Sequence, residues 1–228
     1  DYTPAPDRPV FILAIGNDGR PGDTVTRGDA IHLIGVNPTT RTATMLDLPR
    51  DTGLDIPGHG VDKVNASHTY GGARLEADTI GQAVGVQIPY VIDTDFEGFI
   101  GLVNDMGGLQ VNVPYPMKDS YSGANFAPGP QKLNGEQALQ YARNRHQFPD
   151  SDLTRTQNQG YLILQALTQL RAENTGPIKT LDLLADLGLI ADVKYEVVAA
   201  NSPSIGKVTS SSSGSTKSWR SRSSITIP

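Results

Sequence analysis

Charged side chains gather where three apolar runs of the sequence begin or end. Asp18 follows the first run, Arg27 and Asp29 precede the second, and Arg50 and Asp51 follow the third. Carboxylates beside guanidinium groups suit a divalent cation that shares a phosphate, because Mg²⁺ takes carboxylate and phosphate oxygens and the planar fork of arginine matches a phosphate. The alternative is a set of internal ion pairs at a loop edge, and spacing alone leaves both interpretations open.

A pair of arginines, Arg143 and Arg145, lies beside His146 in the segment YARNRH. Residues i and i+2 share a face on an extended chain, so the pair can clamp an anion if the preceding helix ends near Ala142. Alternatively, the arginines are cations at a helix C-terminus, where the helix dipole favours them. His146 receives no role from this pattern.

Further polar residues lie near the starts of predicted helices. Lys63 precedes a helix, where it either contacts a phosphate or is a solvated lysine. Asp152 and Arg155 lead into a long helix, on which Arg155 and Gln159 are one turn apart and share a face. These residues extend the candidate anion site beyond the strand ends.

The composition excludes several classes of protein. The chain has 228 residues, 37% of them hydrophobic, no cysteine and a formal net charge of −5. It therefore has no disulfide or thiolate metal site, and it is not a general nucleic-acid binder. The four histidines lack the i, i+4 spacing of a metal site, and no GxSxG, Walker or Rossmann motif occurs.

The sequence contains no candidate membrane span, because no apolar run approaches the roughly 20 residues that a span needs. The chain opens with Asp1-Tyr2-Thr3-Pro4, which is typical of a cut just upstream of a domain. We therefore expect an N-terminal membrane anchor that is absent from this chain.

The elements that must position the charged residues begin with three strands. Apolar runs predict strands at Val10–Ile15, Ala30–Val36 and Thr42–Leu48, and a short turn predicts that the last two pair as a hairpin. If the first and third strands run parallel with the second antiparallel between them, their charged ends share one edge of a sheet. That topology would bring Asp18, Arg27, Asp29, Arg50 and Asp51 together.

The rest of the chain mixes helices and short strands, which predicts an α/β or α+β fold of helices layered on a sheet. Residues 59–72 and 115–132 are expected as loops. Asn134 and Gln137 form a capping-box pattern at the start of a short helix. Helices are expected at 73–85, 96–108, 133–142, 156–172 and 181–189, and strands at 89–95 and 109–114; the buried face of the helix at 156–172 is Leu162, Ile163, Ala166, Leu167 and Leu170.

Seven segments in order carry a resemblance to a known family. They are FILAIGNDGR, TRGDAIHLIGV, LDLPRDT, DKVNASHTYGG, FEGFIGLVNDMGGLQVNVP, LNGEQALQYARNR and DLTRTQNQ. Together, over about Val10 to Leu170, they resemble the LytR-CpsA-Psr (LCP) family. The resemblance implies an α/β domain of three layers (α-β-α), a central mixed sheet flanked by helices, with an apolar tunnel for a lipid.

The same resemblance implies a function. LCP proteins are anchored at the extracytoplasmic face of the bacterial membrane. They move a glycopolymer, such as wall teichoic acid, capsule or arabinogalactan, from a polyprenyl-pyrophosphate carrier to peptidoglycan. The expected partners are thus the lipid-linked glycan, the peptidoglycan acceptor and the membrane, with no nucleic acid; the expected cofactor is Mg²⁺, with Mn²⁺ as an alternative.

The resemblance also implies roles for residues that match the family's motifs. Asp18 and Asp29 match the metal-binding aspartates, and Asp152 matches a supporting polar position. Residues of 96–103 and 161–170 are expected to line the lipid tunnel or, alternatively, an ordinary core. The pyrophosphate-binding positions are Arg27, Arg50, Lys63, Arg143, Arg145, Arg155 and Gln159, and the catalytic ones are Arg50, Asp51 and Arg145.

Three residues depart from the family pattern. Asn17 and Gly28 stand where serine is usual, and Asn158 stands where many members carry an arginine, which would reduce positive charge at the pyrophosphate. The expected division is a lead-in at 1–9, the catalytic domain at 10–192 and a Ser-rich segment of unknown role at 193–228.

The mechanism implied is phosphoryl transfer to a sugar hydroxyl, with Mg²⁺ and arginines offsetting the phosphate charge. Either Asp51 or Asp29 could take the proton. Two other functions stay open at this point: a pyrophosphatase that uses water in place of the sugar, and a non-catalytic module that binds lipid or cell wall.

Overall fold

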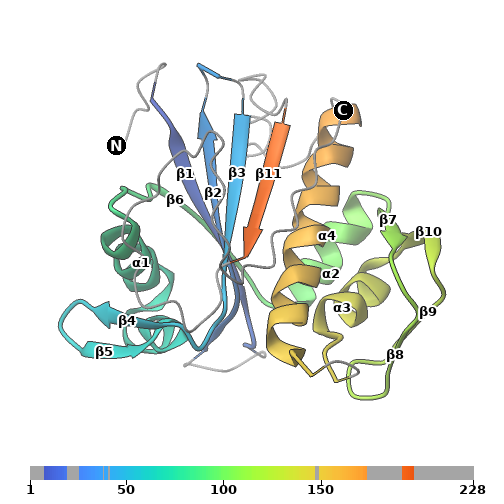
Figure 1. Cartoon of the computed structure of the whole chain (residues 1–228), viewed down its shortest axis with the longest axis horizontal. Coiled ribbons are helices and arrows are strands. Elements are labelled where there is room, and N and C mark those ends of the chain that lie inside the picture. The colour runs from blue at the N-terminus through green and yellow to red at the C-terminus, as the bar shows by residue number, and fades with distance from the viewer. Residues whose placement is uncertain are drawn as a thin grey trace, which may run out of the picture.

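The described part of the chain is built around one mixed sheet. A computed structural model describes residues 8–19, 26–37, 39–40, 42–146, 149–173 and 192–197. The sheet consists of β1 (Val10–Asn17), β2 (Gly28–Asn37), β3 (Thr42–Leu48), β6 (Tyr90–Thr94) and β11 (Asp192–Val197). Their order across the sheet is β11-β3-β2-β1-β6 (Figure 1).

Helices cover both faces of this sheet. They are α1 (Val64–Val84), α2 (Phe96–Asp105), α3 (Gly135–Arg143) and α4 (Ser151–Glu173). Figure 1 shows α1 on one face and α2, α3 and α4 gathered on the other. The predicted α/β class, a central mixed sheet flanked by helices, is confirmed. None of the described helices is long and apolar enough to cross a membrane.

The pairing of the first three strands is the one that the candidate site requires. β2 pairs antiparallel with both β1 and β3, so β1 and β3 run in the same direction. The ends of β1 and β3 and the start of β2 therefore lie at one edge of the sheet, as expected. β6 adds in parallel beside β1, and β11 adds in parallel beside β3. The sequence pattern does not predict β11.

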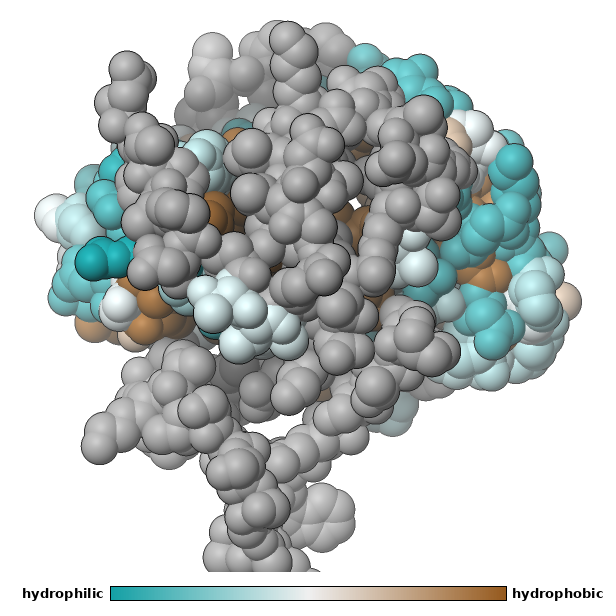
Figure 2. All heavy atoms as spheres, turned by 90° about the horizontal axis from the view of Figure 1, so that it is seen from above, coloured by the Kyte–Doolittle hydropathy of each residue, from teal (hydrophilic) through white to brown (hydrophobic). Residues whose placement is uncertain are grey.

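The sheet is buried on both faces because its strands are continuous apolar runs. On the α4 side Ile12, Ile34 and Met45 pack with Leu164 and Leu167. On the α1 side the alternating residues form a second cluster, which includes Leu13, Ile15, Ile31, Leu33, Val64, Ala77 and Ile80. Seen from above, hydrophobic residues show between hydrophilic flanks of the described surface (Figure 2).

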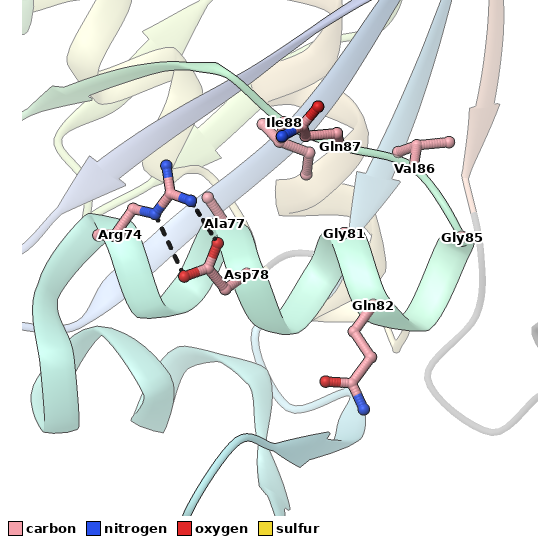
Figure 3. Close-up of a pocket in the computed structure, with 9 residues that line it drawn as sticks. All are labelled: Arg74, Ala77, Asp78, Gly81, Gln82, Gly85, Val86, Gln87 and Ile88. Carbon is pink, nitrogen blue, oxygen red and sulfur yellow. Dashed lines mark hydrogen bonds and ion pairs between the residues drawn. The ribbon is translucent and has the colours of Figure 1, made fainter. Parts of the chain in front are cut away.

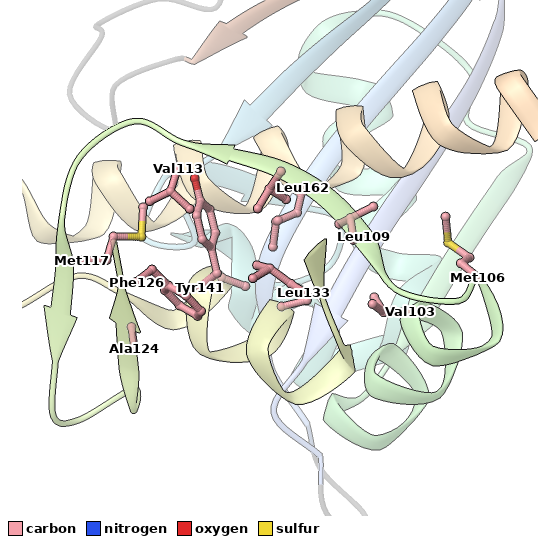
Figure 4. Packing of buried hydrophobic residues seen from close by; sticks show 13 residues of the cluster. Val103, Met106, Leu109, Val113, Met117, Ala124, Phe126, Leu133, Tyr141 and Leu162 are labelled. Atoms are coloured by element: carbon pink, nitrogen blue, oxygen red, sulfur yellow. The ribbon is translucent and has the colours of Figure 1, made fainter. Parts of the chain in front are cut away.

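A third cluster lies beyond α4, away from the central sheet (Figure 4). It is enclosed by α2, α3 and two small ribbons, β7 (Leu109–Val113) with β10 (Gly129–Leu133) and β8 (Met117–Asp119) with β9 (Ala124–Phe126). Tyr141 of α3 is 1% exposed and packs beside Phe126 and Tyr161. The loop expected at 115–132 was thus wrong, since β8, β9 and most of β10 occupy it.

The loop expected at 59–72 was also wrong. The ribbon of β4 (Gly53–Ile56) and β5 (Gly60–Lys63) precedes α1, which begins at Val64 instead of Ala73. Burial of the first turns stabilises a helix where composition indicates a loop. The loop signal came from Gly71 and Gly72, which have non-helical backbone angles and kink α1.

Other expected elements match within a few residues. The capping box at the start of α3 is present, with Asn134 and Gln137 bonding reciprocally. Helix α4 begins at Ser151, five residues before the expected start. Leu162 and Leu167 are buried on it, while Ile163 and Ala166 are partly buried. The side chain of Leu170, the helix expected at 181–189 and residues 198–228 of the expected Ser-rich segment lie outside the described residues, whereas residues 193–197 of that segment belong to β11.

Candidate functional site

The first part of the site is the end of the β1–β2 pair. Asp18 Oδ1 accepts the backbone N–H of Arg27 at 3.0 Å, and the backbone N–H of Asp18 donates to the carbonyl of Arg27 at 3.3 Å. Both residues are exposed. The carboxylate of Asp18 therefore fixes the backbone of Arg27 and leaves its guanidinium group in solvent.

Asp29 and Arg50 form the central ion pair. Arg50 Nη1 lies 2.9 Å from Asp29 Oδ1, and the two side chains are 29% and 24% exposed. Burial opposes the charge of Arg50, but its bond to Asp29 and the charges of the nearby aspartates together outweigh burial and raise the pKa of Arg50. The start of α1 holds the strand end, since the N–H of Asn65 donates to the carbonyl of Arg50.

Asp51 and Lys63 form an outer ion pair at 2.9 Å, with side chains 46% and 58% exposed. The bond from Lys63 is the main cause of a lowered pKa at Asp51, and the charge of Arg50 adds to it. Lys63 is the last residue of β5 and the N-cap of α1. Asp51 is consequently an ionised carboxylate that solvent can reach beside Arg50.

Helix α4 and the connection before it supply the remaining charged residues of the site. Arg155 Nη2 lies 2.7 Å from Asp152 Oδ1 one turn earlier, and Arg145 Nη1 lies 4.0 Å from the same oxygen. Burial lowers the pKa of Arg155, and the charges that act on it include Asp152, Arg50, Asp29 and Arg145. The fold thus brings residues of β2, β3, α4 and the α3–α4 connection into one electrostatic cluster.

The arginine pair of the YARNRH segment is divided by the structure. Arg143 ends α3, is exposed, and holds its guanidinium carbon 5.1 Å from the centre of the Phe96 ring. Arg145 lies beyond the helix and faces Asp152. Arg143 is not among the charges that act on Arg50 or Arg155. Only Arg145 of the two therefore joins the cluster.

Two buried asparagines belong to this region: Asn158, which departs from the family pattern, and Asn144, which had no predicted role. Asn158 is 5% exposed, and its Nδ2 donates to the carbonyl of Asn144 at 3.3 Å. Asn144 is fully buried between the two arginines, and neither atom of its amide has a partner among the described residues. Asn158 thus ties α4 to the segment that carries Arg145 through a hydrogen bond to the backbone.

Several buried polar atoms around the cluster lack partners. Two guanidinium donors, Arg50 Nε and Arg155 Nε, and one acceptor, Gln159 Oε1, have no hydrogen bond among the described residues. Unpaired buried donors are costly, and guanidinium donors match phosphate oxygens. The donor set therefore fits an anion with several oxygens, held between the end of β3 and α4.

The same residues offer little for a metal without that anion. Among the described residues no group of three or more His, Asp or Glu side chains is placed to hold an ion. Asp18 and Asp29 each have one carboxylate oxygen bonded, to the Arg27 backbone and to Arg50. Mg²⁺ is commonly held by one or two carboxylates together with substrate phosphates, and that is the arrangement that these two residues fit.

A partly buried polar cluster lies beneath the β1–β2 end, and the sequence pattern does not predict it. His68 Nε2 donates to Asp93 Oδ2 at 3.1 Å, its Nδ1 shares a hydrogen bond with the Thr26 hydroxyl at 3.1 Å, and Asn17 donates to Asp93 at 2.7 Å. Glu76 is fully buried beside this group, and neither of its oxygens has a described partner. Burial raises the pKa of Glu76 to about 8.

A shallow hollow of about 320 Å³ lies elsewhere, between the C-terminal half of α1 and the segment leading to β6 (Figure 3). An ion pair of Arg74 with Asp78 lies at its rim, and the lining also includes Gly81 and Ile88. None of the candidate site residues lines it. The hollow is therefore separate from the charged cluster.

Comparison with known proteins places these residues in context. The model of the LytR_cpsA_psr family matches residues 2–212. TagU of Bacillus licheniformis, named a polyisoprenyl-teichoic acid–peptidoglycan teichoic acid transferase, is 36% identical over 156 residues, 68% of this chain and 50% of that protein. The chain thus spans about half the length of the curated relatives it matches.

Solved structures share the fold. The crystal structure of TagT from Bacillus subtilis is similar with a TM-score of 0.71 and 27% identity, over 87% of this chain and 82% of that one. A structure of the LytR-CPS2A-psr family protein YwtF (TagT) with bound octaprenyl pyrophosphate lipid gives a TM-score of 0.67 and 26% identity, over 86% and 80% of the two chains.

Proposed function

The chain belongs to the LytR-CpsA-Psr family, and we propose that it transfers a glycopolymer from a polyprenyl-pyrophosphate carrier to peptidoglycan. The observation that carries the proposal is a pair of buried guanidinium donors, Arg50 Nε and Arg155 Nε, which lie beside Asp29 and Asp152 and have no partner in the part of the chain that the structure describes. A pyrophosphate supplies the oxygens that these donors lack. The relative with bound octaprenyl pyrophosphate supports the choice of this anion.

The reaction balances as a single displacement at phosphorus. The hydroxyl of an acceptor sugar loses its proton to a carboxylate, and its oxygen bonds to the phosphorus that carries the glycan. The bond from that phosphorus to the bridging oxygen breaks, and polyprenyl phosphate leaves with the electron pair. Arg50, Arg145 and Arg155 stabilise the charge that builds on the phosphate oxygens.

We assign the proton acceptor to Asp51 in preference to Asp29. Asp51 is the more exposed carboxylate, so an acceptor hydroxyl can approach it from solvent. Its pKa is lowered chiefly by Lys63, so it is ionised at neutral pH, as a base must be. Asp29 is already engaged by Arg50. Together with Asp18 it would hold Mg²⁺, which when bound supplies further neutralisation of the phosphate charge.

The lipid would extend from this edge along apolar side chains of helices α2 and α4. Phe99 and Leu102 of α2 and Tyr161 and Ile163 of α4 are only partly buried against the core clusters, as tunnel-lining residues would be. Each methylene buried there stabilises the complex by about 0.8 kcal/mol. The protein would work at the extracytoplasmic face of a bacterial membrane, held by an N-terminal anchor.

The test supplies purified protein with lipid-linked glycan and Mg²⁺, with and without peptidoglycan, and follows the glycan. We expect glycan bound to peptidoglycan through a phosphate only when the acceptor is present. Free phosphorylated glycan as the sole product would show a pyrophosphatase instead.

A pair of variants separates catalysis from binding to the cell wall. Arg145→Ala should abolish transfer while the fold is kept, whereas Arg74→Ala, which removes an exposed arginine of the separate hollow, should leave transfer unchanged. A fully active Arg145→Ala variant would point to a non-catalytic binding module.

A further inference from the structure

A buried carboxylate outside the charged cluster fixes the segment that carries Arg145. Asp119, the last residue of β8, has a side chain only 1% exposed. Its Oδ2 accepts the backbone N–H groups of Arg145 at 3.1 Å and His146 at 3.3 Å. Its Oδ1 accepts the N–H of Tyr121 at 2.9 Å. One side chain thus joins the β8–β9 ribbon to the α3–α4 connection.

The side chain of His146 adds a fourth donor. Its Nδ1 lies 3.0 Å from Asp119 Oδ2, and the exposed ring of Tyr121 packs on the His146 ring with centres 4.4 Å apart. Burial alone would raise the pKa of Asp119, but the backbone and histidine donors outweigh burial and hold it well below its usual range. Asp119 is therefore a permanent anion whose charge is met by N–H groups.

The segment from Asn144 to His146 has few other means of support. Helix α3 ends at Arg143, and its C-cap Asn144 is already extended, at φ −64° and ψ 121°. Asn158 of α4 binds the carbonyl of Asn144 from one side. Asp119 binds the next two backbone N–H groups from the other side. These two contacts hold the backbone on both sides of Arg145.

This position is what aims the guanidinium group of Arg145 at the cluster. Arginine has a long, flexible side chain, so a clamp is pre-organised only if its backbone is held. With the backbone held, Arg145 Nη1 lies 4.0 Å from Asp152, next to Arg155. If it were released, the guanidinium group would spend most of its time in solvent.

We propose that Asp119 is a positioning residue for pyrophosphate binding, which acts through the backbone of Arg145 and does not touch the substrate. The proposal rests on the proposed function, because it takes the anion of that reaction as the ligand of Arg145. It also gives His146 a role as a second anchor of the same carboxylate.

The test is a double-mutant cycle read by calorimetric titration of inorganic pyrophosphate into the folded chain. Asp119→Asn keeps the shape but removes the charge that accepts the N–H groups, and should weaken binding about tenfold, the worth of roughly one charge-assisted hydrogen bond. Arg145→Ala should weaken binding by a similar factor. Because Asp119 acts through Arg145, the double variant should bind no more weakly than Arg145→Ala alone.

Matched variants make the cycle specific. Asp105→Asn, at an exposed aspartate that ends α2, should bind like the wild type. His146→Ala keeps both backbone bonds to Asp119 and should lose less affinity than Asp119→Asn. Three results would each overturn the assignment to backbone anchoring. They are an affinity of Asp119→Asn equal to that of the wild type, losses of affinity that multiply in the double variant, and a loss of affinity in His146→Ala as large as that in Asp119→Asn.

A second measurement uses the wild type and so does not depend on how the variants fold. The amide protons of Arg145 and His146 should exchange slowly with solvent, because a buried carboxylate accepts both. Fast exchange at both positions would overturn the proposal. If the wild type binds pyrophosphate but does not transfer glycan, the proposed function is wrong and the positioning role of Asp119 stands. If the wild type does not bind pyrophosphate at all, Arg145 has no such ligand and the positioning role is wrong.

Discussion

Glu76→Gln should change how the stability of the protein depends on pH. Glu76 is fully buried, both of its oxygens lack a described partner, and burial raises its pKa from 4.5 to about 8. In the unfolded chain the Glu76 carboxyl group loses its proton near its ordinary pKa of 4.5, whereas in the folded protein it keeps the proton until about pH 8. Between these values the unfolded state binds fewer protons, so the free energy of unfolding falls as pH rises.

The magnitude follows from the linkage relation. One proton difference changes the free energy of unfolding by about 1.4 kcal/mol per pH unit, so the wild type should lose at most about 3 kcal/mol through Glu76 from pH 5.5 to 7.5. Glutamine leaves a buried amide in place, which costs a constant amount at every pH. The free energy of unfolding of Glu76→Gln, relative to that of the wild type, should therefore increase as pH rises and become constant above the pKa of Glu76 in the folded protein.

The assay is urea unfolding of both proteins at half-unit steps from pH 5 to 9. His68 also has a raised pKa, mainly through its bond to Asp93, and its contribution to stability is likewise lost as pH rises through that value. Glu76 and His68 each shift the pKa of the other, so the difference between the two proteins reports the titration of Glu76 together with its coupling to His68. Glu97→Gln, at an exposed glutamate of α2, is the control and should track the wild type. A constant difference between Glu76→Gln and the wild type would refute the reasoning.

Three further outcomes are expected. Gly28→Ala should destabilise the fold by about 1–3 kcal/mol, because an added Cβ would lie 2.7 Å from both oxygens of Glu76, and a Glu76→Ala background should relieve most of this loss in thermal melts. Asp29→Ala should abolish the Mg²⁺ dependence of glycan transfer; unchanged activity and metal dependence would contradict the metal assignment. Asn134→Ala should cost about 1 kcal/mol in urea unfolding, since its side chain caps α3 by accepting the N–H of Gln137 at 2.9 Å.

Local signals were enough to predict the parts of the fold that depend on neighbouring residues. The apolar runs and the turn at Asn37 predict β1, β2 and β3 and the antiparallel pairing of β2 with β3. Asn134 and Gln137 predict the start of α3 because both halves of a capping box lie within four residues. The charged edge followed from the strand directions alone.

What the sequence did not reveal depends on contacts between distant segments. The start of α1 is stabilised by burial of Asn65, Ser67 and His68, none of which carries an apolar pattern. Strands β8 and β9 have three residues each, too few for an alternation to register. Asp119 binds the backbone N–H groups of residues 26 and 27 positions further along the chain. Because every residue except proline has such a group, the sequence cannot show which residues are the partners.

The two interpretations of the arginine pair turn out to describe different residues. Arg143 ends a helix and lies over Phe96, as a cation favoured by a helix terminus would. Arg145 is the one that a buried carboxylate holds toward Asp152. The spacing of the two arginines in the sequence predicts the same role for both only if both have the same backbone conformation. In the structure the chain leaves the helix between them, at Asn144.

The charged edge is neutralised by its own carboxylates, and this bears on how an anion would enter. Arg50 is paired with Asp29, and Arg155 and Arg145 share Asp152. A pyrophosphate that takes over the guanidinium groups must compete with these carboxylates, which would then be left as unpaired, partly buried anions. A divalent cation arriving with the anion removes that penalty at Asp29. Anion and cation binding should therefore be coupled at this edge, each strengthening the other by the same factor.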